Sequence, residues 1–168
     1  NPEVRTVIDI GGQDSKVIRR DENGALANFV MNDKCAAGTG RFLEMMARTM
    51  EMSLDDMGKA GLSYKEDITI SSMCTVFAES EVVSLIAQNK ATDDIVHGLN
   101  KAVASKTAAL AERVGGEERY MMTGGVSKNQ GLVKTLEEKL GTTLVISDKA
   151  QLCGALGAAL FAKDMVIE

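Results

Sequence analysis

The first part of the chain alternates hydrophobic and polar residues in short runs that are separated by glycine-containing turns. Residues 7–10, 16–20 and 26–31 are enriched in strand-forming residues, and the turns are Gly11-Gly12-Gln13-Asp14 and Asn23-Gly24. Runs of this kind on either side of a two-glycine or Asn-Gly turn are typical of strands joined as hairpins. The pattern therefore predicts three consecutive antiparallel strands at the start of the domain.

From Thr39 onward the hydrophobic spacing changes to that of helices. We expect helices from Thr39, over about 76–88 and over about 93–114, where Gly115-Gly116 ends the last of them. The remaining pattern predicts a strand, a helix, a strand and a small-residue helix, at residues 119–123, 131–140, 143–146 and 151–163. This order indicates an α/β fold, with a mixed sheet flanked by helices in a single domain over residues 1–168.

Composition narrows the class of protein. The chain has 168 residues, 45% of them hydrophobic and 26% charged, which is the balance of a folded globular domain. A net charge of −5 provides no basic surface for nucleic acid, so no nucleic-acid partner is expected. The most apolar stretch, residues 152–162, is too short to span a membrane, and no charged leader precedes an apolar segment. Three cysteines without close pairing indicate a reducing compartment, which predicts a cytoplasmic protein.

The first glycine turn carries candidate chemistry. Gly11 and Gly12 can direct successive backbone N–H groups at a phosphate, while the flanking carboxylates of Asp9 and Asp14 can hold Mg²⁺ directly or through water. The motif is not a Walker A loop, because no Gly-Lys-Ser/Thr follows. The alternative is an ordinary reverse turn with solvated acids.

A second glycine loop, residues 122–129, strengthens the first interpretation. Gly124 and Gly125 follow a predicted strand, and Asn129 precedes a predicted helix. Ligands of α/β sheets bind at such strand ends, where glycine lets a base or ribose approach the backbone. The two loops together predict a site that holds phosphate with one loop and adenosine with the other.

Two cysteines lie just ahead of predicted helices. Cys35 precedes the helix that begins near Thr39, and Cys74 precedes the helix at about 76–88. A helix N-terminus stabilises a thiolate, and thiolates bind iron and zinc. Because two ligands are too few for a cluster that takes four, a twofold dimer in which each chain gives Cys35 and Cys74 predicts one shared [4Fe–4S] cluster. The alternative is that both are small buried residues.

Two further residues are assigned structural positions. Cys153 belongs to a small-residue stretch and is expected in the core. His97, the only histidine, is expected in a surface or structural position rather than as a catalytic base.

With these residues in view, the chain closely resembles the ATP-dependent activators of 2-hydroxyacyl-CoA dehydratases. Their family also contains the ATPase subunits of benzoyl-CoA reductases. The resemblance covers nearly the whole chain, and its most specific stretches are residues 32–42 and 71–81. The other matching stretches are residues 7–14, 123–126 and 154–160.

The resemblance implies the actin/Hsp70/sugar-kinase fold, which is ribonuclease H-like, and a homodimer with one [4Fe–4S] cluster held by Cys35 and Cys74. It also implies that ATP hydrolysis, with Mg²⁺, rearranges the helices at the cluster. One low-potential electron then passes to a partner dehydratase, where it forms a ketyl radical that permits elimination of water. Reduced ferredoxin or flavodoxin is the implied electron source.

Carried onto this sequence, the resemblance assigns Gly11, Gly12 and Gln13 to the second phosphate loop and places Gln151 close to the nucleotide. Gly124 and Gly125 become the adenosine loop, with Asn129 at its end. Asp9, Gln13 and Asp14 are the candidate catalytic residues.

One departure from the family is large, because the preceding lobe and its Asp-x-Gly-Ser/Thr phosphate loop have no counterpart in this sequence. The chain therefore resembles the C-terminal lobe only, and ATP hydrolysis by this chain alone is expected to be weak or absent. Three other interpretations remain: a benzoyl-CoA reductase subunit, a metal-free sugar-kinase-like lobe, and a non-catalytic assembly module.

Overall fold

A computed structural model of the chain describes residues 1–71 and 74–166 and is built on one five-stranded mixed sheet. β1 (Thr6–Ile10), β2 (Ser15–Arg20) and β3 (Leu26–Asn32) form consecutive antiparallel pairs. β4 (Tyr120–Thr123) pairs with β1 in parallel, and β5 (Val145–Ile146) pairs with β4 in parallel, which gives the order β3-β2-β1-β4-β5. The predicted opening of three antiparallel strands and the mixed α/β architecture are confirmed.

One face of the sheet forms the core. Ile8 lies opposite Val17 of β2 and opposite Met122 of β4, and all three side chains are almost completely buried. Burial alternates along β1, as the two-residue period of a strand requires when one face is covered. The register therefore places every second residue of β1 against the helices and leaves Asp9 on the other face.

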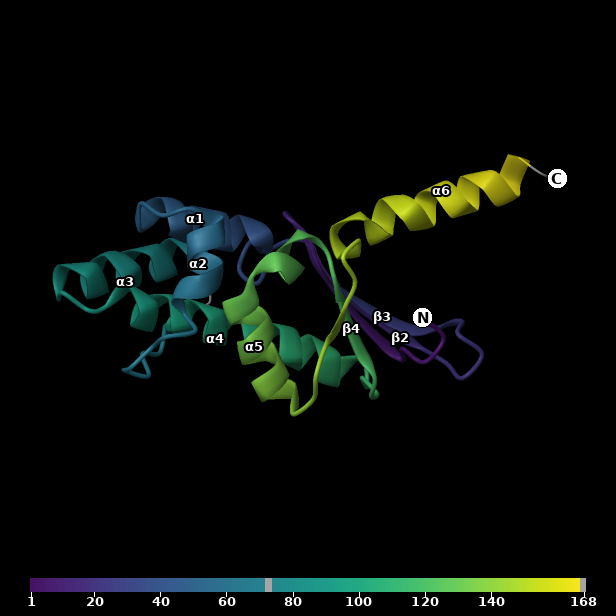
Figure 1. Cartoon of the computed structure of the whole chain (residues 1–168), viewed down its shortest axis with the longest axis horizontal. Coiled ribbons are helices and arrows are strands. Elements are labelled where there is room, and N and C mark those ends of the chain that lie inside the picture. Colours follow the sequence, from purple (N-terminus) through teal and green to yellow (C-terminus); the bar gives the residue numbers. More distant parts are fainter. Residues whose placement is uncertain (72–73, 167–168) are drawn as a thin grey trace.

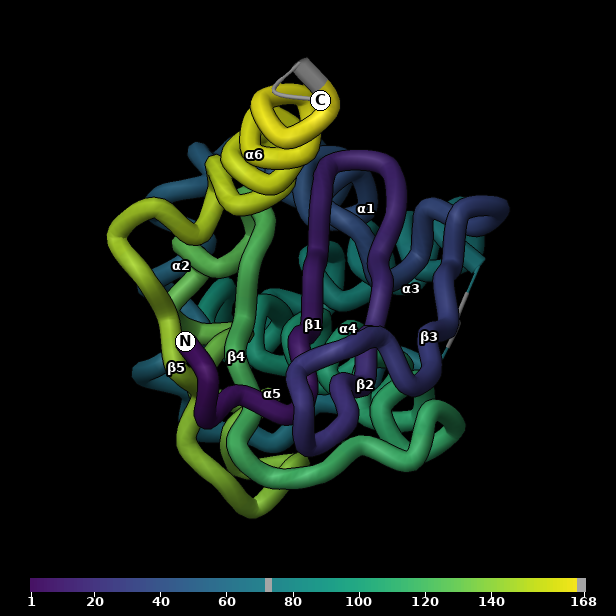
Figure 2. The backbone as a smooth tube through the Cα atoms, turned by 90° about the vertical axis from the view of Figure 1, so that its right-hand side faces the viewer, coloured from purple at the N-terminus to yellow at the C-terminus, as the bar shows by residue number. Residues whose placement is uncertain are grey.

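Helices cover the buried face of the sheet (Figures 1 and 2). Figure 2 views the opposite face, and α1 to α5 lie behind the sheet. The longest helix, α4, contacts α5 and the strands β1 to β3. The helices are α1 (Gly40–Thr49), α2 (Leu54–Ala60), α3 (Thr75–Ala87), α4 (Thr92–Arg113), α5 (Gln130–Leu140) and α6 (Cys153–Val166). Two short 3-10 turns, η1 (Gly125–Lys128) and η2 (Ala150–Leu152), precede α5 and α6.

The predicted helices and strands agree with the structure to within about two residues at most ends, and one helix was missed. The sequence pattern did not predict α2, which is only seven residues long. Its start carries a usable signal, since the Ser53 hydroxyl accepts a hydrogen bond from the Asp56 backbone N–H at 3.0 Å. The last strand is shorter than predicted, at Val145–Ile146.

The final helix corrects one prediction. Cys153 was expected in the core, but its side chain is partly exposed, and α6 projects from the body of the molecule (Figure 1). Leu156 and Leu160 are exposed, and Phe161 is 76% exposed. A run of small and apolar residues indicates that a helix favours burial, but the run does not identify the surface that covers it. None of the described helices is long and apolar enough to cross a membrane.

His97 occupies a structural position, as predicted. It is buried on α4, its ring stacks on Tyr64 with the ring centroids 3.5 Å apart, and its Nε2 lies 3.7 Å from Asp67 Oδ1. Burial, the dominant cause, lowers the pKa of His97, while the nearby Asp67 carboxylate acts in the opposite direction. The imidazole therefore holds the segment between α2 and α3 against α4.

Candidate functional site

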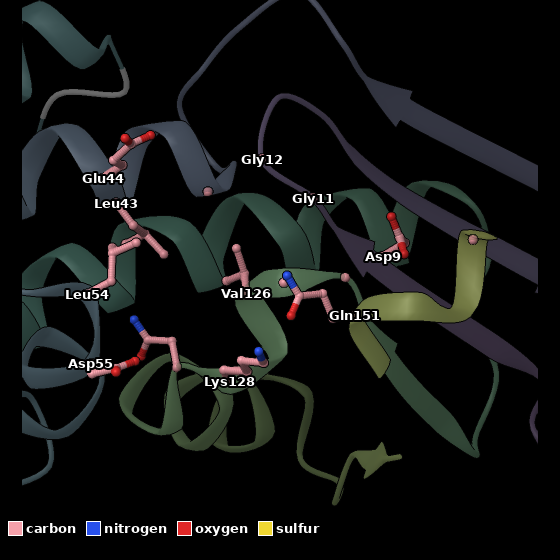
Figure 3. A pocket seen from close by; sticks show the side chains of 15 residues that line it. Asp9, Gly11, Gly12, Leu43, Glu44, Leu54, Asp55, Val126, Lys128 and Gln151 are labelled. Atoms are coloured by element: carbon pink, nitrogen blue, oxygen red, sulfur yellow. The ribbon is translucent and has the colours of Figure 1, made fainter. Parts of the chain in front are cut away.

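A cavity of about 590 Å³ lies where the two glycine loops meet (Figure 3). The β1–β2 hairpin and the loop after β4 both line it, as do the first part of α1, the start of α2 and the junction of η2 with α6. Seven residues that the sequence nominated for the site line this cavity: Asp9, Gly11, Gly12, Gly124, Gly125, Asn129 and Gln151. Segments more than 100 residues apart in the sequence thus form one site.

Asp9 is held in place by two neighbours. Its Oδ2 accepts a hydrogen bond from the Thr123 hydroxyl at 2.6 Å, and its Oδ1 lies 3.5 Å from Lys16 Nζ. Lys16 Nζ also donates to Asp14 Oδ1 at 2.8 Å, and this hydrogen bond is the main reason that the pKa of Lys16 is raised. Lys16 therefore stays protonated between two carboxylates. A Mg²⁺ ion held by Asp9 and Asp14 would compete with it.

The hairpin itself is closed by a backbone hydrogen bond from Gly11 N–H to Asp14 O at 3.0 Å. Gly12 has open space where a side chain would begin, and it faces the cavity. Gln13 is exposed at the tip and, like Asp14, is not among the residues that line the cavity. Of the three candidate catalytic residues, only Asp9 lies in the cavity wall.

The second loop requires glycine for a steric reason. Gly124 has a φ of +86°, and a Cβ atom at this position would lie 2.2 Å from the Ile10 carbonyl oxygen. The backbone of this loop is therefore packed directly on the end of β1. The next residue, Gly125, faces the Gln151 side chain, whose Nε2 lies 3.7 Å from the position of a Gly125 Cβ atom.

The cavity wall combines polar and apolar side chains. In Figure 3, Asp9 lies at one side, Gln151 lies in the middle, and the opposite side carries two apolar and two acidic side chains, Leu43, Leu54, Glu44 and Asp55. Asn129 performs a structural task as well, because its Oδ1 accepts the Leu132 N–H at 2.8 Å and caps α5.

Sequence reasoning missed several residues of the wall. Leu43 and Glu44 belong to α1, Leu54 and Asp55 begin α2, and Gly40 starts α1. The only sequence signal for Gly40 was its place in Gly38-Thr39-Gly40 ahead of a helix. The others have the ordinary composition of helices, and they reach the site only because α1 begins at the hairpin and α2 packs against α1 and α5.

The two candidate metal ligands lie outside the cavity. Cys35 is exposed in the segment between β3 and α1, and Cys74 is exposed at the N-cap of α3. The alternative that both are buried small residues is therefore wrong. Among the described residues, no group of three or more Cys, His, Asp and Glu side chains could hold a metal ion.

Comparison with known proteins identifies the family. Residues 1–162 match the BadF/BadG/BcrA/BcrD ATPase family. The chain belongs to this family. It is 52% identical over 161 residues to the (R)-2-hydroxyglutaryl-CoA dehydratase activating ATPase of Acidaminococcus fermentans, covering 96% of this chain and 62% of that protein.

A second relative has a solved structure. The chain is 48% identical over 163 residues to the 2-hydroxyisocaproyl-CoA dehydratase activator of Clostridioides difficile, covering 97% of this chain and 61% of the activator. The structure of that activator with bound ADPNP superposes with a TM-score of 0.94 over 98% of this chain and 62% of its own. This member of the BadF/BadG/BcrA/BcrD family thus spans about three fifths of the length of these relatives.

More distant likenesses agree on the fold and the family. A ParM structure, 13% identical, superposes with a TM-score of 0.53 over 95% of this chain and 46% of its own. The chain has the actin/Hsp70-like ATPase fold. It is also 33% identical over 167 residues to a subunit of the benzoyl-CoA reductase of Thauera aromatica, covering 96% of this chain and 59% of that protein.

Proposed function

We propose that this chain is the C-terminal lobe of an activator that couples ATP hydrolysis to one-electron donation to a 2-hydroxyacyl-CoA dehydratase. The observation that carries the proposal is the cavity formed by the two glycine loops, in a chain about half identical to such activators. We further propose that the activator works as a cytoplasmic homodimer.

In the proposed nucleotide site, the hairpin of Gly11 and Gly12 binds phosphate oxygens through backbone N–H groups. Asp9 and Asp14, which now contact Lys16, would hold Mg²⁺ beside the phosphates, and the exposed Gln13 would orient the attacking water. Gly124, Gly125 and Gln151 contact the adenosine, and Asn129 borders it. We propose that a preceding lobe supplies the first phosphate loop. ATP hydrolysis by the present chain alone should then be slow.

The cysteines fit half of a shared iron–sulfur site. Both thiol-bearing residues are exposed, so a second chain can reach them, and each lies ahead of a helix. A [4Fe–4S] cluster takes about four thiolates, which a twofold dimer of this chain would provide. When bound, the cluster would supply a low-potential electron, with reduced ferredoxin or flavodoxin as the source. Cys35 and Cys74 would hold it against the ends of two neighbouring helices.

Iron content tests this proposal. On protein purified without oxygen, we expect about four iron and four acid-labile sulfide per dimer. Cys35→Ser and Cys74→Ser should each abolish the cluster, while Cys153→Ser, the matched control, should retain it. Iron-free protein after anaerobic reconstitution, or full iron in the Cys35 and Cys74 variants, would contradict the proposal. A metal-free nucleotide-binding lobe would then be the better interpretation.

A second candidate is the ATPase subunit of a benzoyl-CoA reductase-type enzyme, which the 33% identity to the Thauera aromatica reductase subunit favours. It shares the proposed nucleotide and cluster chemistry and differs in the electron acceptor. Electron transfer to a purified dehydratase, compared with transfer to a benzoyl-CoA reductase core, separates the two. The higher identity to dehydratase activators makes the first acceptor our choice.

A further inference from the structure

The segment that carries Cys35, residues 33–39, is pinned at its β3 end by a side chain. Asn32 Nδ2 donates hydrogen bonds to Cys35 O at 2.8 Å and to Ala37 O at 3.2 Å. The Thr39 hydroxyl donates to Ala36 O at 2.6 Å. Backbone carbonyls of the segment are thus bonded to side chains, which limits the positions that the exposed Cys35 can take.

The middle of the segment is held from α4. Lys106 Nζ donates to Ala37 O at 2.6 Å. Gly38 has a φ of +86°, and a Cβ atom there would lie 2.9 Å from Lys106 Cδ, so the aliphatic part of the lysine packs against the segment. A half-buried lysine therefore clamps the chain two residues after Cys35 to the longest helix of the core.

The other end of the segment joins the cavity. Gly40 N–H donates to Gly11 O at 2.8 Å, and Arg41 N–H donates to Gly12 O at 2.7 Å. The first amides of a helix have no partner within the helix, and here the glycine hairpin provides the acceptors. The contact is close, since a Cβ atom on Gly40 would lie 2.9 Å from Gly11 O. The hairpin that lines the cavity is thus bonded directly to the first turn of α1.

We infer that two positioning groups act on the segment that carries Cys35: the Arg41 backbone amide ties it to the nucleotide cavity, and the Lys106 ammonium holds it against α4. A ligand that displaces the hairpin at Gly12 moves α1 through the Arg41 bond. The Lys106 clamp limits how much of that movement reaches Cys35. The tie itself follows from the hydrogen bonds of this chain, whereas its use in electron transfer rests on the proposed function.

A proline substitution isolates the amide. Arg41 is the second residue of α1, where proline is tolerated, so Arg41→Pro removes the N–H and its bond to Gly12 O. Arg41→Ala is the matched control, because it removes the same side chain and keeps the amide. Lys106→Met removes the hydrogen bond from Lys106 to Ala37 O. Its control is Lys101→Met, because Lys101 lies on the same helix but donates its hydrogen bond to Asp67.

The readout is the rate at which iodoacetamide alkylates each cysteine in the reduced, iron-free full chain, measured by peptide mass spectrometry. Relative to their controls, Arg41→Pro and Lys106→Met should each raise the Cys35 rate by about threefold or more, as expected when local opening becomes easier. The rate at Cys74 should not change. Mg²⁺ with ADPNP should alter the Cys35 rate in Arg41→Ala and alter it clearly less in Arg41→Pro, where only the bond from Gly40 N–H to Gly11 O still joins the hairpin to α1.

Equal Cys35 rates within both variant pairs would overturn the inference, whether or not the chain binds nucleotide. Thermal melting by circular dichroism identifies an unfolded Arg41→Pro protein, in which all cysteines react quickly, and the lysine pair then decides. Because this assay needs no iron, a failure of the cluster proposal leaves its result interpretable.

Discussion

At the scale of single residues, Gly124 shows how tightly the second loop is packed. Its backbone has a positive φ, and its missing side chain leaves room for the carbonyl of Ile10. Gly141, at the end of α5, also has a positive φ of +69°, but no atom lies within 4 Å of the position of its Cβ. The two glycines share a conformational requirement and differ in the space around them.

We therefore expect Gly124→Ala to destabilise the fold by about 3 kcal/mol or more, because the new methyl group collides with backbone that cannot move aside. Gly141→Ala, the control, should cost only about 1 kcal/mol, which is the cost of the left-handed conformation. Urea denaturation followed by circular dichroism measures both. Equal losses in the two variants would show that the contact with Ile10 is not restrictive.

His97 gives a prediction about pH. Because burial lowers the pKa of His97 in the folded state, the unfolded chain binds the proton more readily. The free energy of unfolding should therefore fall as the pH drops through the ordinary histidine pKa, about 6.5, and should not depend on this group well above that pH. Unfolding by urea at a series of pH values measures this, and His97→Gln should remove the step.

Asp67→Asn tests the direction in which the Asp67 carboxylate shifts the pKa of His97. The Asp67 carboxylate favours the protonated imidazole, so its removal should lower the pKa of His97 further and enlarge the loss of stability in acid. A smaller loss in Asp67→Asn than in the unchanged protein would show that the Asp67 carboxylate does not favour the protonated imidazole.

At the scale of elements, the residue that precedes α5 has two tasks. Asn129 caps the helix and also lines the cavity. Asn129→Ala should lower the free energy of unfolding by about 1 kcal/mol through loss of the cap. Asn129→Asp keeps an oxygen acceptor for the Leu132 N–H, so stability should be retained. It also adds a negative charge to the cavity wall.

Calorimetric titration of the proposed nucleotide site with ADPNP separates these tasks. We expect Asn129→Asp to bind ADPNP more weakly than the unchanged chain at equal stability, because the added charge repels the phosphates. Unchanged affinity in Asn129→Asp would place the nucleotide away from this part of the cavity.

Elements were also where the sequence was most and least informative. The strands and long helices were predictable because their hydrophobic periods are clear, and the two glycine loops were recognisable because special backbone geometry restricts the residue type. The helix α2 was missed because its seven residues form only about two turns, which is too few to show a helical period. Lys16 was missed because nothing in a strand pattern shows that its side chain lies between Asp9 and Asp14.

At the scale of the whole molecule, the apolar surface of α6 stands out. Phe161 and Met165 are 76% and 80% exposed, and α6 projects from the sheet face that α1 to α5 leave uncovered (Figure 2). The Clostridioides difficile activator matches 98% of this chain in three dimensions and is longer by about two fifths of its own length. The same helix is therefore found in a larger molecule.

For the present chain alone, this surface should bind an apolar dye. Phe161→Ser should lower the fluorescence of bound anilinonaphthalene sulfonate, while the free energy of unfolding should stay within about 0.5 kcal/mol, because the side chain is largely exposed. Phe77→Ser on α3, where Phe77 is 67% exposed and follows the exposed Val76, is the control for an apolar residue on another helix. A large loss of stability in Phe161→Ser would mean that α6 is packed on the body of the molecule.

The start of α6 lies at the rim of the cavity, where Gln151 and Gly154 line the wall, and exposed apolar residues continue along the helix to its far end. One helix thus has the cavity at its base and exposed apolar residues at its tip. If a ligand in the cavity changes the direction of α6, it changes by some factor the affinity of α6 for a surface that covers its tip. Thermodynamic reciprocity then requires that the covering surface change the affinity for the ligand by the same factor.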